Sequence, residues 1–343
     1  MSVSLQNKKL YLHLVWLGLS VLVLTLLYLF YNTRGNLAFA LNLRVSRLPA
    51  FALVGLATAV ATVVFQTIAK NNILSPSIIG LDSLYSLFQT LIIFFFGSGH
   101  LLGRSSQLNF IVSTVLMVVA SFGLFYIFFK LYPGRIFLLL MTGLIFGTLM
   151  RNLIVFFQAL IDPNEFQTIL SRTLVSFNTV DSSLVWLSLI IVAPIVIYLF
   201  FHSHTLDVLH LGDVYAKGLG VHVDREYFYL FILVSILTAV STALVGPITF
   251  LGFLGANLAY RIMPSYHHTW LFLTASFITV LLLIASQFIV EHLLPVRTST
   301  GIVIELIGGI YFLYLIIKER KQISWWIWTM SAKLLVKKLS YRM

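Results

Sequence analysis

Long apolar runs recur from end to end of this chain, separated by short polar segments. A helix needs about 20 apolar residues to cross the roughly 30 Å hydrocarbon core of a bilayer. Runs of about that length, some of them shorter, cover residues 10–31, 48–69, 78–96, 108–129, 136–158, 184–201, 228–245, 249–262, 271–290 and 301–317. The pattern therefore predicts an all-α polytopic membrane protein with about ten transmembrane helices.

Composition supports a membrane location. Of 343 residues, 59% are hydrophobic and 10% charged, which is more apolar surface than a soluble fold of this length buries. The first run follows Lys8 and Lys9, as the apolar region of a signal peptide follows its basic residues. The run is too long for such a region, however, and lacks a small-residue cleavage site. We expect a retained helix. With no cysteine, the chain has no disulfide, thiolate metal site or cysteine nucleophile.

The net charge of +11 raises the possibility of nucleic-acid binding, but the basic residues lie in short loops and at the C-terminus. They are better interpreted as topology signals, and we expect no nucleic-acid partner. An even number of crossings with an inner N-terminus puts most of them, and both termini, on the cytoplasmic side. The exceptions, predicted to lie outside, are Arg34, Arg44, Arg47, Arg104, Arg172 and Arg297.

Two places interrupt the helical pattern. Residues 70–80 join two apolar runs through polar residues and Pro76, and Gly246-Pro247 precedes a run that is short or half-spanning. Broken backbone at membrane depth must be buried in protein or line a wet cavity, which favours a transport path. A kinked helix within a bundle is the alternative.

The last residues have a different composition. Residues 322–343 are aromatic and basic, which suits a helix lying at the surface of an anionic leaflet. An extension without a role is the alternative. We therefore divide the chain into a transmembrane domain, residues 1–321, and an amphipathic tail, residues 322–343.

Four sequence blocks, in order, resemble a known family. They are RVSRLPAFALVG at 44–55 with NNILSPSIIG at 71–80, LGDVYAKGLGV at 211–221, GPITFLGFLGANLAYR at 246–261, and TGIVIELIGGIYF at 300–312. Together they resemble the permeases of iron-siderophore and vitamin B12 importers, the FecCD-type family of ABC importers. The family usually has Pro-His at 256–257, Pro at 72 and Ala-Pro at 309–310. This chain departs from the family at these positions. The residues found there, together with residues 176–178, resemble those of the branch that imports catechol siderophores such as petrobactin and anguibactin.

The resemblance implies the type II ABC importer permease architecture and the function of its permease subunit, import of an iron-siderophore complex into the cytoplasm. It implies a multi-pass protein of the bacterial cytoplasmic membrane, in contact with lipid. Its partners would be a second permease, identical or different, two cytoplasmic ABC ATPases and an extracytoplasmic solute-binding protein. The chain has no G-x-x-x-x-G-K-[ST] phosphate loop. We expect no enzymatic site and no cofactor in this chain, with ATP used by the partner subunits.

The resemblance also assigns site residues. The cytoplasmic gate would comprise Asn71, Asn72 and Ile73, faced by Tyr132, Pro133 and Gly134. The ATPase coupling loop would comprise Leu211, Gly212, Asp213, Lys217 and Gly220. Binding-protein docking would use Arg44 and Arg47, supplemented by Arg297. The alternatives are a tight turn for the gate, a solvated connector for the loop, and lipid phosphate contact for the arginines.

Charges inside apolar runs are the remaining candidates. Arg151 and Glu305 could line the translocation path, because intramembrane charges usually face a cavity or a partner. His202, His204 and His210 lack partners at a ligand spacing, so no metal site is expected. An ion- or proton-coupled secondary transporter would need several intramembrane carboxylates, and only Asp82 and Glu305 come close. A membrane enzyme, or a permease for haem or cobalamin, also remains open.

Overall fold

The computed structural model describes residues 3–33, 35–101, 105–131, 136–178, 180–294 and 298–318, and these contain helices but no strand. Eight stretches are long and apolar enough to cross a membrane. They are α1 (Val3–Phe30), α2 with α3 (Leu37–Val45 and Leu48–Ala69), α6 (Ser106–Leu131), α7 (Ile136–Leu160), α9 (Ser182–Phe201), α12 (Val223–Val245), α14 (His268–His292) and Thr300–Lys318. Two shorter helices, α4 (Leu81–Phe96) and α13 (Leu251–Ile262), complete the expected ten segments. The predicted all-α polytopic fold is confirmed, while the tail, residues 322–343, lies outside the described residues.

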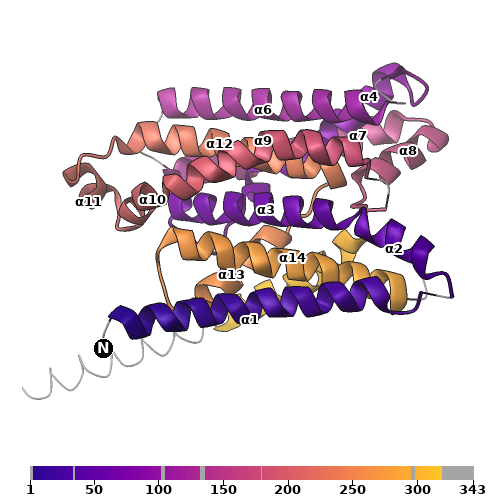
Figure 1. Cartoon of the computed structure of the whole chain (residues 1–343). Helices are drawn as coiled ribbons and strands as arrows, with labels where there is room; N and C mark the ends of the chain where they lie inside the picture. Colours follow the sequence, from indigo (N-terminus) through magenta and orange to yellow (C-terminus); the bar gives the residue numbers. More distant parts are fainter. Residues whose placement is uncertain are drawn as a thin grey trace, which may run out of the picture.

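The long helices lie side by side along one common axis (Figure 1). The N-terminus, α10 (Ser203–His210) and α11 (Asp213–Gly218) lie together at one end, which we call the inner end. The other, outer end carries α2 and α8 (Pro163–Thr173). These two helices were not predicted, because each is too short to cross a bilayer. Side-chain caps start them: Asn36 accepts a hydrogen bond from an α2 amide, and Asp162 from an α8 amide.

Helix α3 forms the centre of the bundle and is buried along nearly its whole length. Small residues let α14 approach it closely, since a Cβ atom on Gly55 would lie 2.7 Å from the Val280 side chain. The Thr279 hydroxyl donates a hydrogen bond to the Gly55 carbonyl at 2.8 Å. By contrast, α1 exposes large apolar side chains along its length, as a lipid-facing helix does.

The first predicted helix break lies between α3 and α4, where residues 70–75 and a 3-10 turn, η1 (Pro76–Ile79), replace regular helix. Two buried amide side chains satisfy the carbonyls of this segment. Gln66 Nε2 donates to the carbonyls of Asn72 at 2.7 Å and Leu74 at 3.0 Å, and Asn257 Nδ2 donates to Asn72 at 3.0 Å. The broken backbone is therefore buried in protein, as membrane depth requires.

The second break separates α12 from α13, and α13 is short, as predicted, with 12 residues. Gly246 takes a φ of +98°, and the freed Val245 carbonyl accepts a hydrogen bond from the Ser176 amide at 3.0 Å. The two breaks meet at a small polar cavity lined by Asp82, Thr242 and Thr249. Both interruptions thus lie in one region, against the middle of α3.

Candidate functional site

The predicted coupling loop folds into two short helices at the inner end, α10 and α11. Around α11 it exposes large apolar side chains: Leu211, Val214, Tyr215 and Leu219 are each at least 62% exposed. They lie outside the stretches long enough to span a membrane, so lipid does not account for them. Exposed large apolar side chains gathered on one short segment are typical of a surface that contacts another protein.

The coupling loop is linked to the predicted gate. Asp213 Oδ1 accepts a hydrogen bond from Tyr227 at 2.6 Å and pairs with Lys70 Nζ at 2.8 Å, and Lys70 immediately precedes the gate residues. Within the gate, the Asn71 side chain accepts a hydrogen bond from the Ile73 amide at 2.9 Å. Burial would raise the pKa of the Asp213 carboxyl, but its hydrogen bonds with Lys70 and Tyr227 hold that pKa below its ordinary value.

The gate and the coupling loop also share a hollow. It has a volume of about 500 Å³, and its lining includes Lys70, Asn71, Asp213 and Ile136. Tyr132, Pro133 and Gly134, predicted to face the gate, lie outside the described residues. Their role therefore stays a prediction.

A second carboxylate, Asp207 on α10, binds the loop to α14. Its Oδ1 lies 2.6 Å from His268 Nδ1 and accepts from the His268 amide at 2.8 Å, and its Oδ2 lies 2.9 Å from His267 Nδ1. His268 Nε2 in turn lies 2.7 Å from the Thr67 hydroxyl on α3. Burial alone would raise the pKa of Asp207, but hydrogen bonds from His268 and His267 outweigh it and lower the pKa to about 2.

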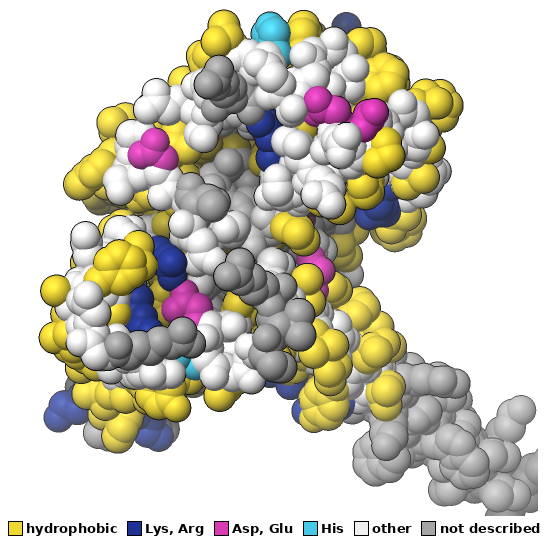
Figure 2. All heavy atoms as spheres, turned by 90° about the vertical axis from the view of Figure 1, so that its right-hand side faces the viewer, with side chains coloured by type: hydrophobic (Ala, Val, Ile, Leu, Met, Phe, Trp, Pro, Cys, Tyr) yellow, Lys and Arg dark blue, Asp and Glu magenta, His cyan; other side chains and the backbone are white. Residues whose placement is uncertain are grey.

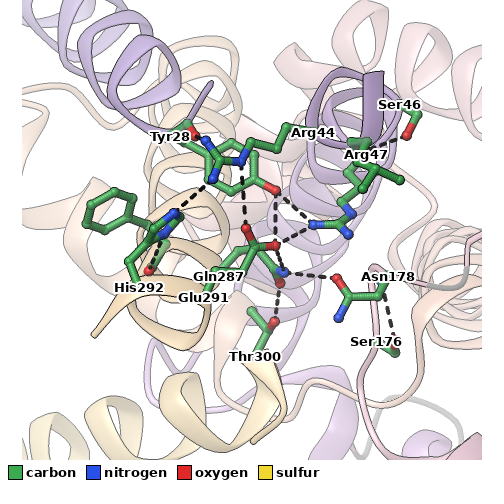
Figure 3. Close-up of polar contacts among 12 residues, drawn as sticks. Tyr28, Arg44, Ser46, Arg47, Ser176, Asn178, Gln287, Glu291, His292 and Thr300 are labelled. Atoms are coloured by element: carbon green, nitrogen blue, oxygen red, sulfur yellow. Dashed lines mark hydrogen bonds and ion pairs between the residues drawn. The ribbon is translucent and has the colours of Figure 1, made fainter. Parts of the chain in front are cut away.

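Two arginines dominate the outer end (Figure 3). Arg44 is buried, and its Nη1 donates to the carbonyls of Tyr28, Leu29 and Tyr31 at 2.8–2.9 Å. These carbonyls belong to the last turn of α1 and the residue after it, where the helix leaves them without partners of its own. The other nitrogen, Nη2, lies 2.9 Å from His292 Nε2. Arg44 is therefore a cap for α1.

Glu291 on α14 is the counter-ion of both arginines. It pairs with Arg47 directly and with Arg44 Nε at 3.9 Å, and Gln287 donates to it at 2.7 Å. The side chains of Arg44 and Arg47 are only 9% and 16% exposed. Both side chains are therefore largely buried, because α1 and α14 enclose them. Their docking role itself stays a prediction.

A hollow opens beside this cluster. It measures about 650 Å³, and its lining includes Arg44, Arg47, Glu291, Asn36 and Asn178. Figure 2 looks onto the outer end and shows basic and acidic side chains together inside a recess framed by uncharged ones. Arg297 lies outside the described residues, and its docking role stays a prediction.

The two remaining candidates are not brought together. Arg151 is exposed on α7 and donates only to Thr148 of the same helix, at 3.3 Å, among the hydrogen bonds of the described residues. Glu305 is exposed on the helix Thr300–Lys318. Both candidates lie on the surface of the bundle. In the described part of the chain, no three His, Cys, Asp or Glu side chains are grouped to hold a metal ion.

Sequence reasoning missed Glu291 and Asp207, the two carboxylates that organise the outer and inner clusters. Both stand near the ends of apolar runs, where a carboxylate is ordinary. Their basic and histidine partners lie 244 and 61 residues away in the sequence. Each carboxylate and its partners lie near the ends of helices, and this shared position was the only signal in the sequence that could have pointed to the pairs.

This combination of features defines a class of protein. In the described part of the chain, membrane-crossing helices surround two helix breaks, and one end carries a loop with exposed apolar side chains. That is a membrane-embedded transport permease.

The chain belongs to the FecCD transport family, whose match covers residues 9–318. It is 44% identical to the petrobactin import system permease protein YclO of Bacillus subtilis, over 90% of this chain and 96% of that protein. It is 33% identical to the petrobactin import system permease protein FatC of Bacillus anthracis, over 81% and 78% of the two chains. A solved inward-facing structure assigned to the metal-chelate type of ABC transporter matches with a TM-score of 0.77 and 22% identity, covering 91% of this chain and 99% of its own. The fold and the importer-permease class are thus as predicted.

Replacing Asp207 tests the inner cluster. Its folded-state pKa of about 2 lies below the ordinary 3.8, so its stabilisation is complete above about pH 4 and is lost as the pH falls towards 2. We expect Asp207→Asn to cost about 2 kcal/mol at neutral pH, measured by thermal unfolding in detergent. The difference from wild type should shrink below about pH 4.

Asp162→Asn is the matched control, because asparagine also caps a helix and its effect should be small at every pH. A wild-type to Asp207→Asn difference that stays constant down to about pH 3 would contradict the assigned role of the carboxylate.

Proposed function

We propose that this chain is the permease subunit of an ABC importer that carries an iron–siderophore complex of the petrobactin kind across the bacterial cytoplasmic membrane. The observation that carries the proposal is the 44% identity, over nearly the full length of both chains, to a protein named as a petrobactin import permease. A second relative bears the same substrate in its name. Identity to a hemin transport permease, HmuU of Yersinia pestis, is lower, at 26%.

Energy would enter through the coupling loop. Two cytoplasmic ATPases would receive the apolar side chains around α11, with both termini of this chain on the same side of the membrane. ATP binding would close the ATPases, move the loop and open the gate at Asn71–Ile73. The exposure of Val214 and Tyr215 supports this assignment, because a free cytoplasmic loop would not keep them in water.

The translocation path would run between two permeases. Arg151 and Glu305 lie on the surface of this bundle, so they could line a path only where a second permease faces them. A ferric catecholate is anionic, and Arg151 would attract it. The second permease is an identical or a related chain.

Uptake by the assembled complex tests the proposal. We expect proteoliposomes containing this chain, its permease partner, the ATPases and the binding protein to import ferric petrobactin only when ATP is supplied inside. Accumulated radioactive iron is the measurement, and ferric hydroxamate and haem serve as competing cargoes. Uptake by the chain alone, driven by an ion gradient, would instead establish a secondary transporter.

The coupling loop is tested by Gly220→Trp. Gly220 takes a φ of +85°, which a bulky residue adopts only with strain, so α11 would be displaced. We expect ATP hydrolysis to continue while iron uptake falls by about tenfold or more, as an inserted side chain at a packed contact costs over 1 kcal/mol. Gly99→Trp, in an outer segment with open space around it, should leave uptake unchanged. Normal uptake by a well-expressed Gly220→Trp variant would remove this loop as the contact.

We also propose that the outer arginines receive acidic residues of the binding protein. In the free permease, Glu291 forms ion pairs with Arg44 and Arg47. A carboxylate of the binding protein would therefore compete with Glu291 for the arginines, or bind them together with Glu291 from the adjoining hollow. Arg297 would supplement them. Charges at such an interface mainly set the association rate and its salt dependence.

Two variants with opposite effects test this docking role. Arg44→Glu with Arg47→Glu should weaken docking of the binding protein on immobilised complex strongly at low salt and less at high salt. Glu291→Gln leaves both arginines in place without a counter-ion, so docking at low salt should hold or strengthen. Basal ATP hydrolysis reports whether each variant remains assembled. Docking that the double reversal leaves unaltered at low salt would exclude the assignment.

A further inference from the structure

The last turn of α3 is held by the coupling loop at two points. Asp213, the first residue of α11, pairs with Lys70 at 2.8 Å. Asp207 on α10 reaches Thr67 through His268, with contacts of 2.6 and 2.7 Å. Thr67 and Lys70 lie one turn apart, so both attachments meet the same end of the same helix. Each of the two short loop helices thus has its own contact with α3.

The attachment through His268 is the more rigid of the two. The His268 side chain is fully buried, and its backbone amide also donates to Asp207 at 2.8 Å. In a buried network of this kind, the hydrogen bonds strengthen one another, and a broken one is costly. A displacement of α10 therefore displaces the first residue of α14 and the end of α3 together.

The Lys70 attachment is half exposed, and an ion pair of that exposure contributes little to stability. Its position is what matters. Lys70 is the point where the chain leaves α3, and it takes a φ of +51°, a left-handed conformation uncommon for a residue with a side chain. Tyr227 holds the same Asp213 oxygen at 2.6 Å, which fixes the carboxylate relative to α12. The ion pair therefore holds the residue at which helix becomes gate loop.

The gate itself is tied between two helices. The Asn72 carbonyl accepts hydrogen bonds from Gln66 on α3 and from Asn257 on α13. If the last turn of α3 moves relative to α13, both bonds cannot be kept. A small displacement at Lys70 is thereby converted into the release of one side of the gate loop.

We propose that the last turn of α3 carries motion from the coupling loop to the gate, with Lys70 as a positioning residue and Asp213 as its partner. This inference rests on the proposed function of an ATP-driven importer. It adds the residues through which movement of the coupling loop would reach the gate. Lys70 touches no cargo in this scheme and acts only through the gate loop that follows it.

The number of ATP molecules hydrolysed per iron imported tests the link in the reconstituted complex. Lys70→Ala should raise this ratio severalfold while hydrolysis and assembly persist, and Asp213→Ala should raise it at least as far. The double alanine variant should be no worse than Asp213→Ala alone, because that substitution already removes the contact that Lys70→Ala removes. The reversed pair, Lys70→Asp with Asp213→Lys, should return the ratio towards the wild-type value.

Lys130→Ala is the control. Lys130 is also a lysine near the end of a helix at the inner end, but its ammonium group lies over the Tyr126 ring of its own helix. Its ratio should equal that of wild type. An unchanged ratio in Lys70→Ala, or additive effects of the two alanine substitutions, would overturn the inference. Failure of the proposed function is distinguishable, because the wild-type complex would then show no ATP-driven uptake at all.

Discussion

Every backbone amide and carbonyl within a bilayer must find a partner inside the protein, and the architecture of this chain depends on that constraint. Unbroken helices meet it by themselves. The two interrupted segments cannot, and other groups of the chain satisfy them: the Gln66 and Asn257 side chains bind the carbonyls after α3, and the Ser176 amide binds the Val245 carbonyl at the end of α12. The same need explains Arg44, whose guanidinium binds the last carbonyls of α1. Irregular backbone is thus tolerated where another polar group of the protein reaches it.

The inner and outer ends of the bundle use charge differently. At the inner end, Asp207 and Asp213 join short loop helices to α14 and α3, and the apolar surface of α11 remains uncovered. At the outer end, Glu291 draws two arginines inward, beside an open hollow. Polar contacts therefore hold the loop to the bundle at one end and hold α1, α3 and α14 to each other at the opposite end.

Hydrophobic runs were enough to locate the membrane helices, because few structures besides a membrane-crossing helix require about 20 apolar residues in succession. Pro76 and Gly246-Pro247 marked both breaks for a similar reason, since each removes or bends a helical hydrogen bond. The short helices α2 and α8 have no such signature. The roles of Arg44 and Arg47 depended on Glu291, and one sequence contains no signal that pairs residues 244 positions apart. The burial of both arginines therefore could not be predicted from the sequence.

The wide separation of Arg47 from Glu291 has a consequence for biosynthesis. The arginines are synthesised with the first helices, whereas their carboxylate arrives on α14, near the end of the described chain. Until then, the two positive charges at the outer end of the bundle lack the carboxylate that pairs with them. A chain that stalls before α14 keeps α1 capped by an arginine without a counter-ion. Completion of the bundle is therefore chemically distinct from insertion of its parts, because the arginines gain their counter-ion only when α14 is in place.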